Sequence, residues 1–106
     1  MQLYKYTYRE KKFSVRKFEC ERQIGQNKIP CYVLVEGQRE YGKRIYPVVL
    51  NKLIDESNYV MWSLDKNSLS KFKNLVLERK ENMLKKRMEE CKIIEDEIQS
   101  LKNRGI

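Results

Sequence analysis

Residues 65–103 read DKNSLSKFKNLVLERKENMLKKRMEECKIIEDEIQSLKN, without a glycine or a proline, and this stretch is the most informative part of the sequence. A helix of about 36 residues is about 54 Å long at 1.5 Å per residue, which is longer than a small domain is wide. Asp65, Asn67 and Ser68 are all suitable N-cap residues, and the sequence does not choose between them. We therefore predict one long helix that begins between residues 65 and 68 and ends near residue 103.

The apolar residues of this predicted helix form two groups. Those at positions 69, 72, 75 and 76 suit packing on a sheet. The later ones follow at steps close to a coiled-coil seam: Leu84, Met88, Cys91, Ile94, Ile98 and Leu101. Since the sheet is too short to cover the whole stripe, the sequence favours self-association through the helix, with a homodimer as the smallest assembly. The alternative is that the whole stripe packs on the chain's own sheet.

The residues before the helix alternate in the manner of strands. The pattern predicts strands at 3–9, 13–22, 29–36, 43–49 and 59–64, with a short helical turn at 50–55. The alternation slips near Arg16 and Lys17, which indicates a bulge or a bend. The strand at 29–36 is apolar on both faces and is the candidate for the central strand.

The predicted fold class is therefore α+β. A small antiparallel β-meander over residues 1–64 is followed by one long C-terminal helix over residues 65–106, which mediates oligomerisation. The helix packs on the sheet and on a neighbouring subunit, and the two parts form one domain. The stripe of Tyr4, Tyr6 and Tyr8 is interpreted as a half-buried sheet face.

Composition excludes several classes of protein. The 106 residues include 23 Lys and Arg against 15 Asp and Glu, a net charge of +8, and 41% of them are apolar. This is too apolar for a disordered chain, and no stretch of 18 uncharged apolar residues is available to cross a membrane. The N-terminal residues lack a signal-peptide apolar core, so a cytoplasmic location is expected.

The residue types needed for common catalytic sites are missing from the sequence. It has no histidine, which removes Ser/His and Cys/His catalysis and every zinc site that needs an imidazole. Cys20, Cys31 and Cys91 form no CxxC pair, and we interpret them as small buried residues or as partly exposed on a helix. The four glycines form no phosphate-binding loop. We expect no enzyme, no metal and no cofactor.

Cations and aromatic rings are interleaved in the predicted sheet, over residues 4–9, 16–18 and 43–46. Guanidinium groups bind phosphate oxygens and rings stack on bases, so the pattern fits a nucleotide, a cyclic nucleotide or single-stranded nucleic acid. Tyr and Phe are also ordinary strand residues, and Lys and Arg protect sheet edges. For Arg44, which lies beside Gly42 and Tyr46, the two interpretations have equal weight.

The basic tail at residues 102–105 allows two interpretations. Cations near a helix C-terminus complement the helix dipole, which alone explains the tail. Asn103 and Arg104 at the end of a dimer-forming helix could also close over a ligand held by the neighbouring subunit.

In outline the chain resembles small phage accessory proteins. A basic, aromatic meander leads to the strand Tyr59-Val60-Met61-Trp62 and then to a helix with the pattern Phe72-Lys73-x-Leu75…Glu81…Leu84, which ends in Leu101-Lys102-Asn103-Arg104-Gly105. Among such proteins it is most similar to the Thoeris anti-defence sponge family. The resemblance covers most of the chain in architecture and length, and rests on no diagnostic string of residues.

The resemblance implies an oligomeric, non-enzymatic anti-defence protein. Such a protein sequesters an anionic nucleotide signal, cyclic ADP-ribose-like or a cyclic oligonucleotide, in pockets between subunits. It adds Phe72, Asn103 and Arg104 to Arg44 and Tyr46 as candidate ligand-binding residues. The alternatives are an anti-CRISPR or other protein that binds nucleic acid or a nucleoprotein through its basic sheet, and a coiled-coil scaffold protein.

Overall fold

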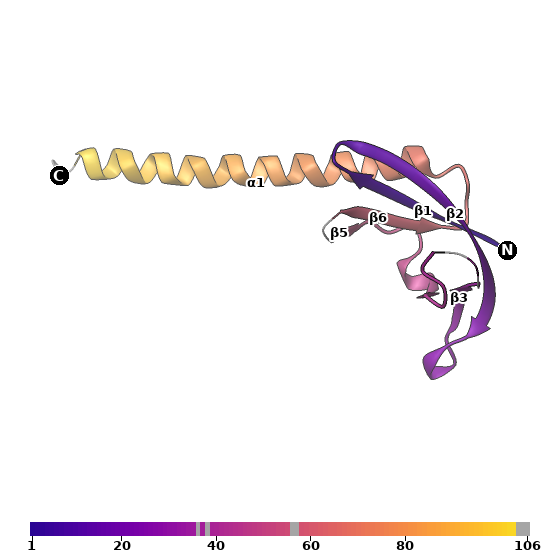
Figure 1. The fold of residues 1–106 in the computed structure, drawn as a ribbon. Helices are drawn as coiled ribbons and strands as arrows, with labels where there is room; N and C mark the ends of the chain where they lie inside the picture. Colours follow the sequence, from indigo (N-terminus) through magenta and orange to yellow (C-terminus); the bar gives the residue numbers. More distant parts are fainter. Residues whose placement is uncertain (36, 38, 56–57, 104–106) are drawn as a thin grey trace. The chain divides into compact units, whose positions relative to one another are not determined.

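The structure is a computed structural model that describes residues 1–35, 37, 39–55 and 58–103 (Figure 1). The strands in the described residues are β1 (Gln2–Arg9), β2 (Lys12–Ile24), β3 (Pro30–Leu34), β4 (Arg44–Ile45), β5 (Ile54–Asp55) and β6 (Tyr59–Ser63). Two 3-10 turns, η1 (Gln26–Lys28) and η2 (Pro47–Val49), precede β3 and follow β4. One helix, α1 (Leu69–Asn103), comes after the strands, so the predicted α+β class is confirmed.

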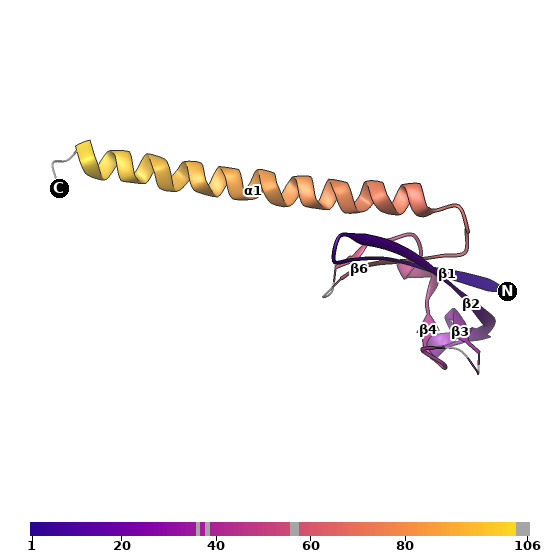
Figure 2. The same ribbon diagram turned by 45° about the horizontal axis from the view of Figure 1, so that its top comes forward.

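The strands form one antiparallel sheet in the order β4-β3-β2-β1-β6-β5. The first four strands are a meander, as predicted, and β6 joins on the other side of β1. The long strand β2 pairs with β1 over its first part and with β3 over its last part. Figures 1 and 2 show β2 curving between these two neighbours.

Two sequence-based predictions about this sheet are wrong. The strand at 29–36 is not central, because β1 and β2 lie in the middle of the order. β3 carries apolar residues on both faces because both faces are covered: Cys31 and Leu34 are buried, and Tyr32 and Val33 are half-buried. The helical turn predicted at 50–55 lies instead at Pro47–Val49, where the fixed φ of proline suits a first helical position, and Ile54–Asp55 is a strand.

The sheet buries apolar residues on both of its faces. One face carries a cluster of Leu3, Phe18, Cys20, Leu34, Ile45 and Trp62. The other carries Tyr6 and Met61 beneath Phe72 and Val76 of α1. The buried face of β2 changes near Arg16, which explains the slip in alternation seen in the sequence. The residues of β2 pair with β1 and then with β3 without interruption, so the described ladder contains a bend and no bulge.

Tyr6 connects the sheet to the start of α1. Its hydroxyl donates a hydrogen bond to the carbonyl of Asp65 at 2.7 Å and accepts one from the backbone N–H of Ser68 at 3.1 Å. Ser68 directly precedes α1, and its carbonyl accepts the N–H of Phe72 at 3.0 Å. Asp65 instead accepts the N–H of Asn67 in the preceding turn at 2.8 Å. Of the three predicted cap residues, Ser68 therefore lies at the helix start.

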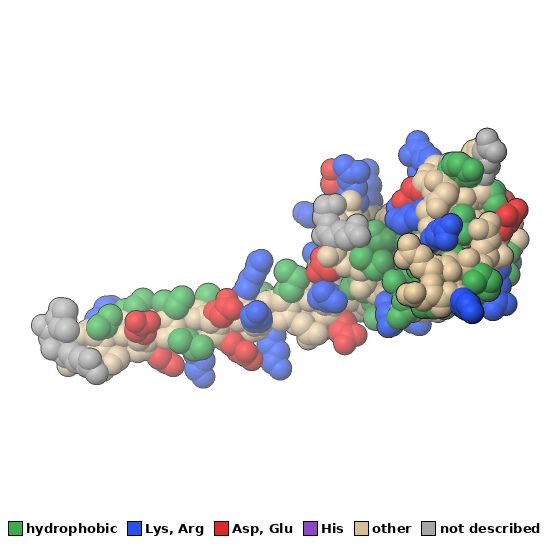
Figure 3. All heavy atoms as spheres, turned by 90° about the horizontal axis from the view of Figure 1, so that it is seen from below, with side chains coloured by type: hydrophobic (Ala, Val, Ile, Leu, Met, Phe, Trp, Pro, Cys, Tyr) green, Lys and Arg blue, Asp and Glu red, His purple; other side chains and the backbone are tan. Residues whose placement is uncertain are grey.

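The chain forms two compact units, Met1–Val76 and Leu77–Ile106. The first unit contains the sheet and also the first two turns of α1, because Phe72 and Val76 belong to the core of the sheet. The sequence pattern places these two turns with the helical part. The described residues of the second unit, 77–103, form a single helical segment with hydrophobic side chains along one edge (Figure 3).

Candidate anion-binding groove

A tight turn fixes which residues of β1 and β2 face each other. Glu10 and Lys11 both have positive φ, at 52° and 64°, as in the two-residue type I′ turns that join antiparallel strands. The resulting register pairs Arg9 with Lys12 and Thr7 with Ser14. Lys5 pairs with Arg16 in the same register. One face of the hairpin therefore carries two pairs of cations on either side of a pair of hydroxyl groups.

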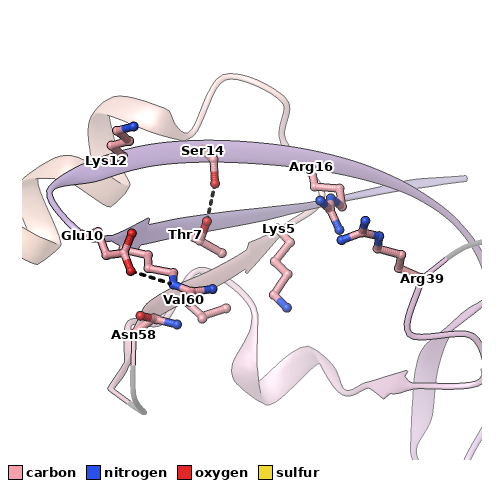
Figure 4. A pocket seen from close by; sticks show the side chains of 10 residues that line it. Lys5, Thr7, Glu10, Lys12, Ser14, Arg16, Arg39, Asn58 and Val60 are labelled. Atoms are coloured by element: carbon pink, nitrogen blue, oxygen red, sulfur yellow. Dashed lines mark hydrogen bonds and ion pairs between the residues drawn. The ribbon is translucent and has the colours of Figure 1, made fainter.

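This face is the wall of a groove with a volume of about 590 Å³. The described residues that line it are Lys5, Thr7, Arg9, Glu10, Lys12, Ser14, Arg16, Arg39, Asn58 and Val60. Arg39 comes from the segment between β3 and β4, and Figure 4 shows its guanidinium and that of Arg16 pointing toward each other. Thr7 and Ser14 are joined by a hydrogen bond between their hydroxyl oxygens.

The positive charge of this groove is only partly neutralised by the chain itself. Glu10 lies 3.8 Å from Arg9, and both side chains are largely exposed, so this ion pair is screened by water. Lys12, Arg16 and Arg39 have no carboxylate partner within the described part of the chain. Like charges directly across a strand pair destabilise a sheet, so an anion bound between them would relieve the repulsion.

A second, smaller hollow of about 200 Å³ adjoins Lys5. Lys5 and Lys43 each place Nζ 5.3 Å from the centre of the Trp62 ring, and both bind the Glu40 carboxylate, at 3.0 and 3.3 Å. Burial alone would raise the pKa of the Glu40 carboxyl. The hydrogen bond and charge of Lys5, together with Lys43, lower that pKa below its ordinary value. Arg44 lines this hollow and is exposed.

Tyr46, the predicted neighbour of Arg44 in the site, packs against the backbone of the turn before β3. Its hydroxyl accepts a hydrogen bond from the backbone N–H of Gln26 at 3.3 Å. A Cβ at Gly25 would lie 2.6 Å from the same oxygen, so only glycine leaves room for the ring. This position gives Tyr46 a structural role, and its binding of a ligand stays a prediction.

The other predicted ligand residues lie elsewhere. Phe72 is fully buried between Tyr6 and Phe13, with ring centres 6.0 and 5.8 Å away, on the face opposite the groove. Asn103 is exposed at the end of α1, and Arg104 lies outside the described residues. The first unit thus does not bring Arg44 and Phe72 together, and the roles of Asn103 and Arg104 stay predictions.

Only four of the groove residues fall within the stretches of interleaved cations and rings that the sequence shows: Lys5, Thr7, Arg9 and Arg16. The signal that could have found them is the two-residue turn at Glu10 and Lys11, which sets the register and places Lys5 opposite Arg16. Arg39 carried no such signal, because its approach to β2 depends on how the segment after β3 folds back.

Comparison with protein-family models, curated proteins and solved structures finds no match. Across the described ranges, no cluster of three or more metal-ligating side chains is found. No helix in the described part of the chain is long and apolar enough to cross a membrane. Cys20 and Cys31 are buried and Cys91 is exposed, in agreement with their interpretation from the sequence.

Proposed function

We propose that the protein binds a small phosphate-bearing anion of the nucleotide class, without turning it over, in the groove beside the β1–β2 hairpin. One observation carries the proposal: the register of the hairpin places two pairs of cations face to face on one side of the sheet. A folded protein gains nothing in stability from such an arrangement, whereas a phosphate group gains charge-assisted hydrogen bonds from it.

The chemistry of the lining supports a phosphate ligand in particular. Guanidinium groups from Arg16 and Arg39 converge from two different segments, and guanidinium binds phosphate through paired N–H donors. The hydroxyl groups of Thr7 and Ser14 and the amide of Asn58 add neutral donors beside them. With a volume of about 590 Å³, the groove is in the range of small-molecule sites.

Together with the resemblance to the Thoeris anti-defence sponge family, the proposal extends to a phage-type protein that sequesters a cyclic ADP-ribose-like or cyclic oligonucleotide signal in the cytoplasm. The part of that proposal in which Arg44 and a neighbouring subunit's Asn103 and Arg104 also contact the ligand rests on the sequence alone.

Isothermal titration with ADP-ribose and with cyclic di-AMP tests this function. We expect one of them to bind in the micromolar range, and mass spectrometry to recover it unchanged after prolonged incubation. The double variant Arg16→Gln/Arg39→Gln should bind at least about tenfold more weakly, because two charge-assisted contacts to phosphate are lost.

The matched control is Lys17→Gln. Lys17 neighbours Arg16 on β2, carries the same charge and is exposed, but alternation along the strand places it on the opposite face. The Lys17→Gln variant should bind the ligand with a dissociation constant within about twofold of that of the unchanged protein, a difference that corresponds to about 0.4 kcal/mol. No binding of either ligand, conversion of the ligand, or an equal loss of affinity in Lys17→Gln and in the double variant Arg16→Gln/Arg39→Gln would each contradict the proposal.

The second candidate function is binding of single-stranded nucleic acid. It is favoured by the length of the cationic wall, which follows both strands of the hairpin from Lys5 to Lys12. Grooves that bind single strands track the phosphate backbone with positive charge in this way.

A further inference from the structure

The segment of α1 from Leu77 to Asn103 exposes an apolar stripe that none of its described residues covers. Leu84 and Met88 are 60% and 64% exposed, and Ile94 is 55% exposed. Further along, Ile98 and Leu101 continue the same stripe. Figure 3 shows hydrophobic side chains in a row along one edge of this segment. Isolated helices with few apolar contacts are only marginally stable in water, so we expect a partner that covers the stripe to stabilise this segment.

The charges of the same segment are divided between its two halves. Residues 77–87 contain five Lys and Arg and two Asp and Glu, whereas residues 88–103 contain two Lys and Arg and five Asp and Glu. The first half therefore carries a net charge of +3 and the second a net charge of −3. A partner that complements this segment must be acidic where the segment begins and basic where it ends.

We propose that the partner is a second copy of the chain, paired antiparallel through residues 77–103. An antiparallel pair places the basic half of each helix beside the acidic half of the other, twice, by two-fold symmetry. A parallel pair would place basic against basic and acidic against acidic. The charge pattern thus fixes an orientation that the apolar spacing alone leaves open.

The seam has a register that matches this orientation. Leu77, Leu84, Cys91 and Ile98 occupy one heptad position and Lys80, Arg87, Ile94 and Leu101 the other, while Met88 of the stripe flanks the seam next to Arg87. An antiparallel pair brings the two sets opposite each other. Leu77 then faces Leu101, and Leu84 faces Ile94. The two cations of the seam, Lys80 and Arg87, face Ile98 and Cys91, which directly follow Glu97 and Glu90. Their aliphatic stems cover the seam while their charges reach these carboxylates.

Disulfide trapping tests the orientation. In a Cys91→Ser background, Leu84→Cys and Ile94→Cys proteins carrying tags of different size are mixed, oxidised in a glutathione buffer and separated on a non-reducing gel. We expect the mixed disulfide to dominate. In the antiparallel register two copies of residue 84 lie about 15 Å apart along the axis, too far for a disulfide. A dominant Leu84→Cys homodimer, or no mixed product, would overturn the proposal.

Sedimentation of the otherwise unchanged protein tests the pairing itself, with two neighbouring isoleucines as a matched pair. Ile94→Asp changes the seam, whereas Ile93→Asp changes a side chain that is even more exposed, at 67%, but lies off the seam. Ile94→Asp should raise the dimer dissociation constant at least about tenfold, and Ile93→Asp by no more than about twofold. A monomer in the unchanged protein, or equal effects of the two substitutions, would contradict the pairing. Ligand binding by the groove plays no part in either experiment.

Discussion

At the scale of single residues, Glu40 links the two hollows of the sheet by binding Lys5 and Lys43 at once. Its carboxylate holds two cations over the ring of Trp62 and offsets part of the positive charge at the end of the groove. The lowered pKa of the Glu40 carboxyl means that its ionised form is the one that the folded protein favours.

The predicted consequence is a loss of stability in acid that depends on Glu40. Because its pKa is lower in the folded than in the unfolded chain, the contribution is complete above the ordinary value of about 4.5 and is lost as the pH falls through the folded value. Urea unfolding should show Glu40→Gln to be less stable by about 0.5–1 kcal/mol at pH 7. At pH 3 the difference in unfolding free energy between Glu40→Gln and the unchanged protein should be smaller.

Glu21 on β2 is also an exposed carboxylate, and the variant Glu21→Gln controls for the loss of one negative charge. If the gap between Glu40→Gln and the unchanged protein were the same at both pH values, the ionised carboxylate would not be the source of the stability.

At the scale of elements, the β1–β2 hairpin sets the geometry of the groove with a turn that its own residues do not favour. Glu10 and Lys11 both adopt the left-handed region, which costs energy for residues with a Cβ. Asn-Gly is the pair that type I′ turns prefer.

Replacement of the turn is therefore predicted to stabilise the protein. Glu10→Asn/Lys11→Gly should raise the free energy of unfolding by about 1 kcal/mol, seen as a higher urea midpoint at an unchanged slope. The reversed pair, Glu10→Gly/Lys11→Asn, contains the same residues in the less favoured order and should gain less. A lower midpoint for the Asn-Gly variant would show that the turn is not of this type.

At the scale of the whole molecule, nearly all of the net charge is carried by one of the two units. Residues 1–76 contain 15 Lys and Arg against eight Asp and Glu, a net charge of +7, whereas residues 77–106 contain eight against seven, a net charge of +1. The sheet unit is therefore the part that attracts anions. The helical segment 77–103 has a basic first half and an acidic second half, whose charges cancel. This separation agrees with a division of roles in which the sheet binds the ligand and the helix binds a second copy.

Salt dependence separates the two candidate functions of the sheet. A cyclic dinucleotide offers two phosphates, so raising the salt from 50 to 200 mM should weaken its binding by only about tenfold. A single-stranded oligonucleotide that occupied the groove with six or more phosphate contacts would lose about 300-fold or more in affinity. Titration of both ligands at the two salt concentrations distinguishes these outcomes, and tight binding of the oligonucleotide alone would favour the second function.

The α+β class, the long helix and most of the strands were predictable from local patterns, because they follow from the spacing of apolar residues and from the absence of glycine and proline over residues 65–103. The tyrosine stripe was correctly interpreted as a sheet face for the same reason, and Tyr6 is fully buried. The central position of β1 and β2, and the approach of Arg39 to Arg16, follow from the folded chain alone. Such arrangements depend on pairing between segments far apart in the chain, and local periodicity carries no information about which segments meet.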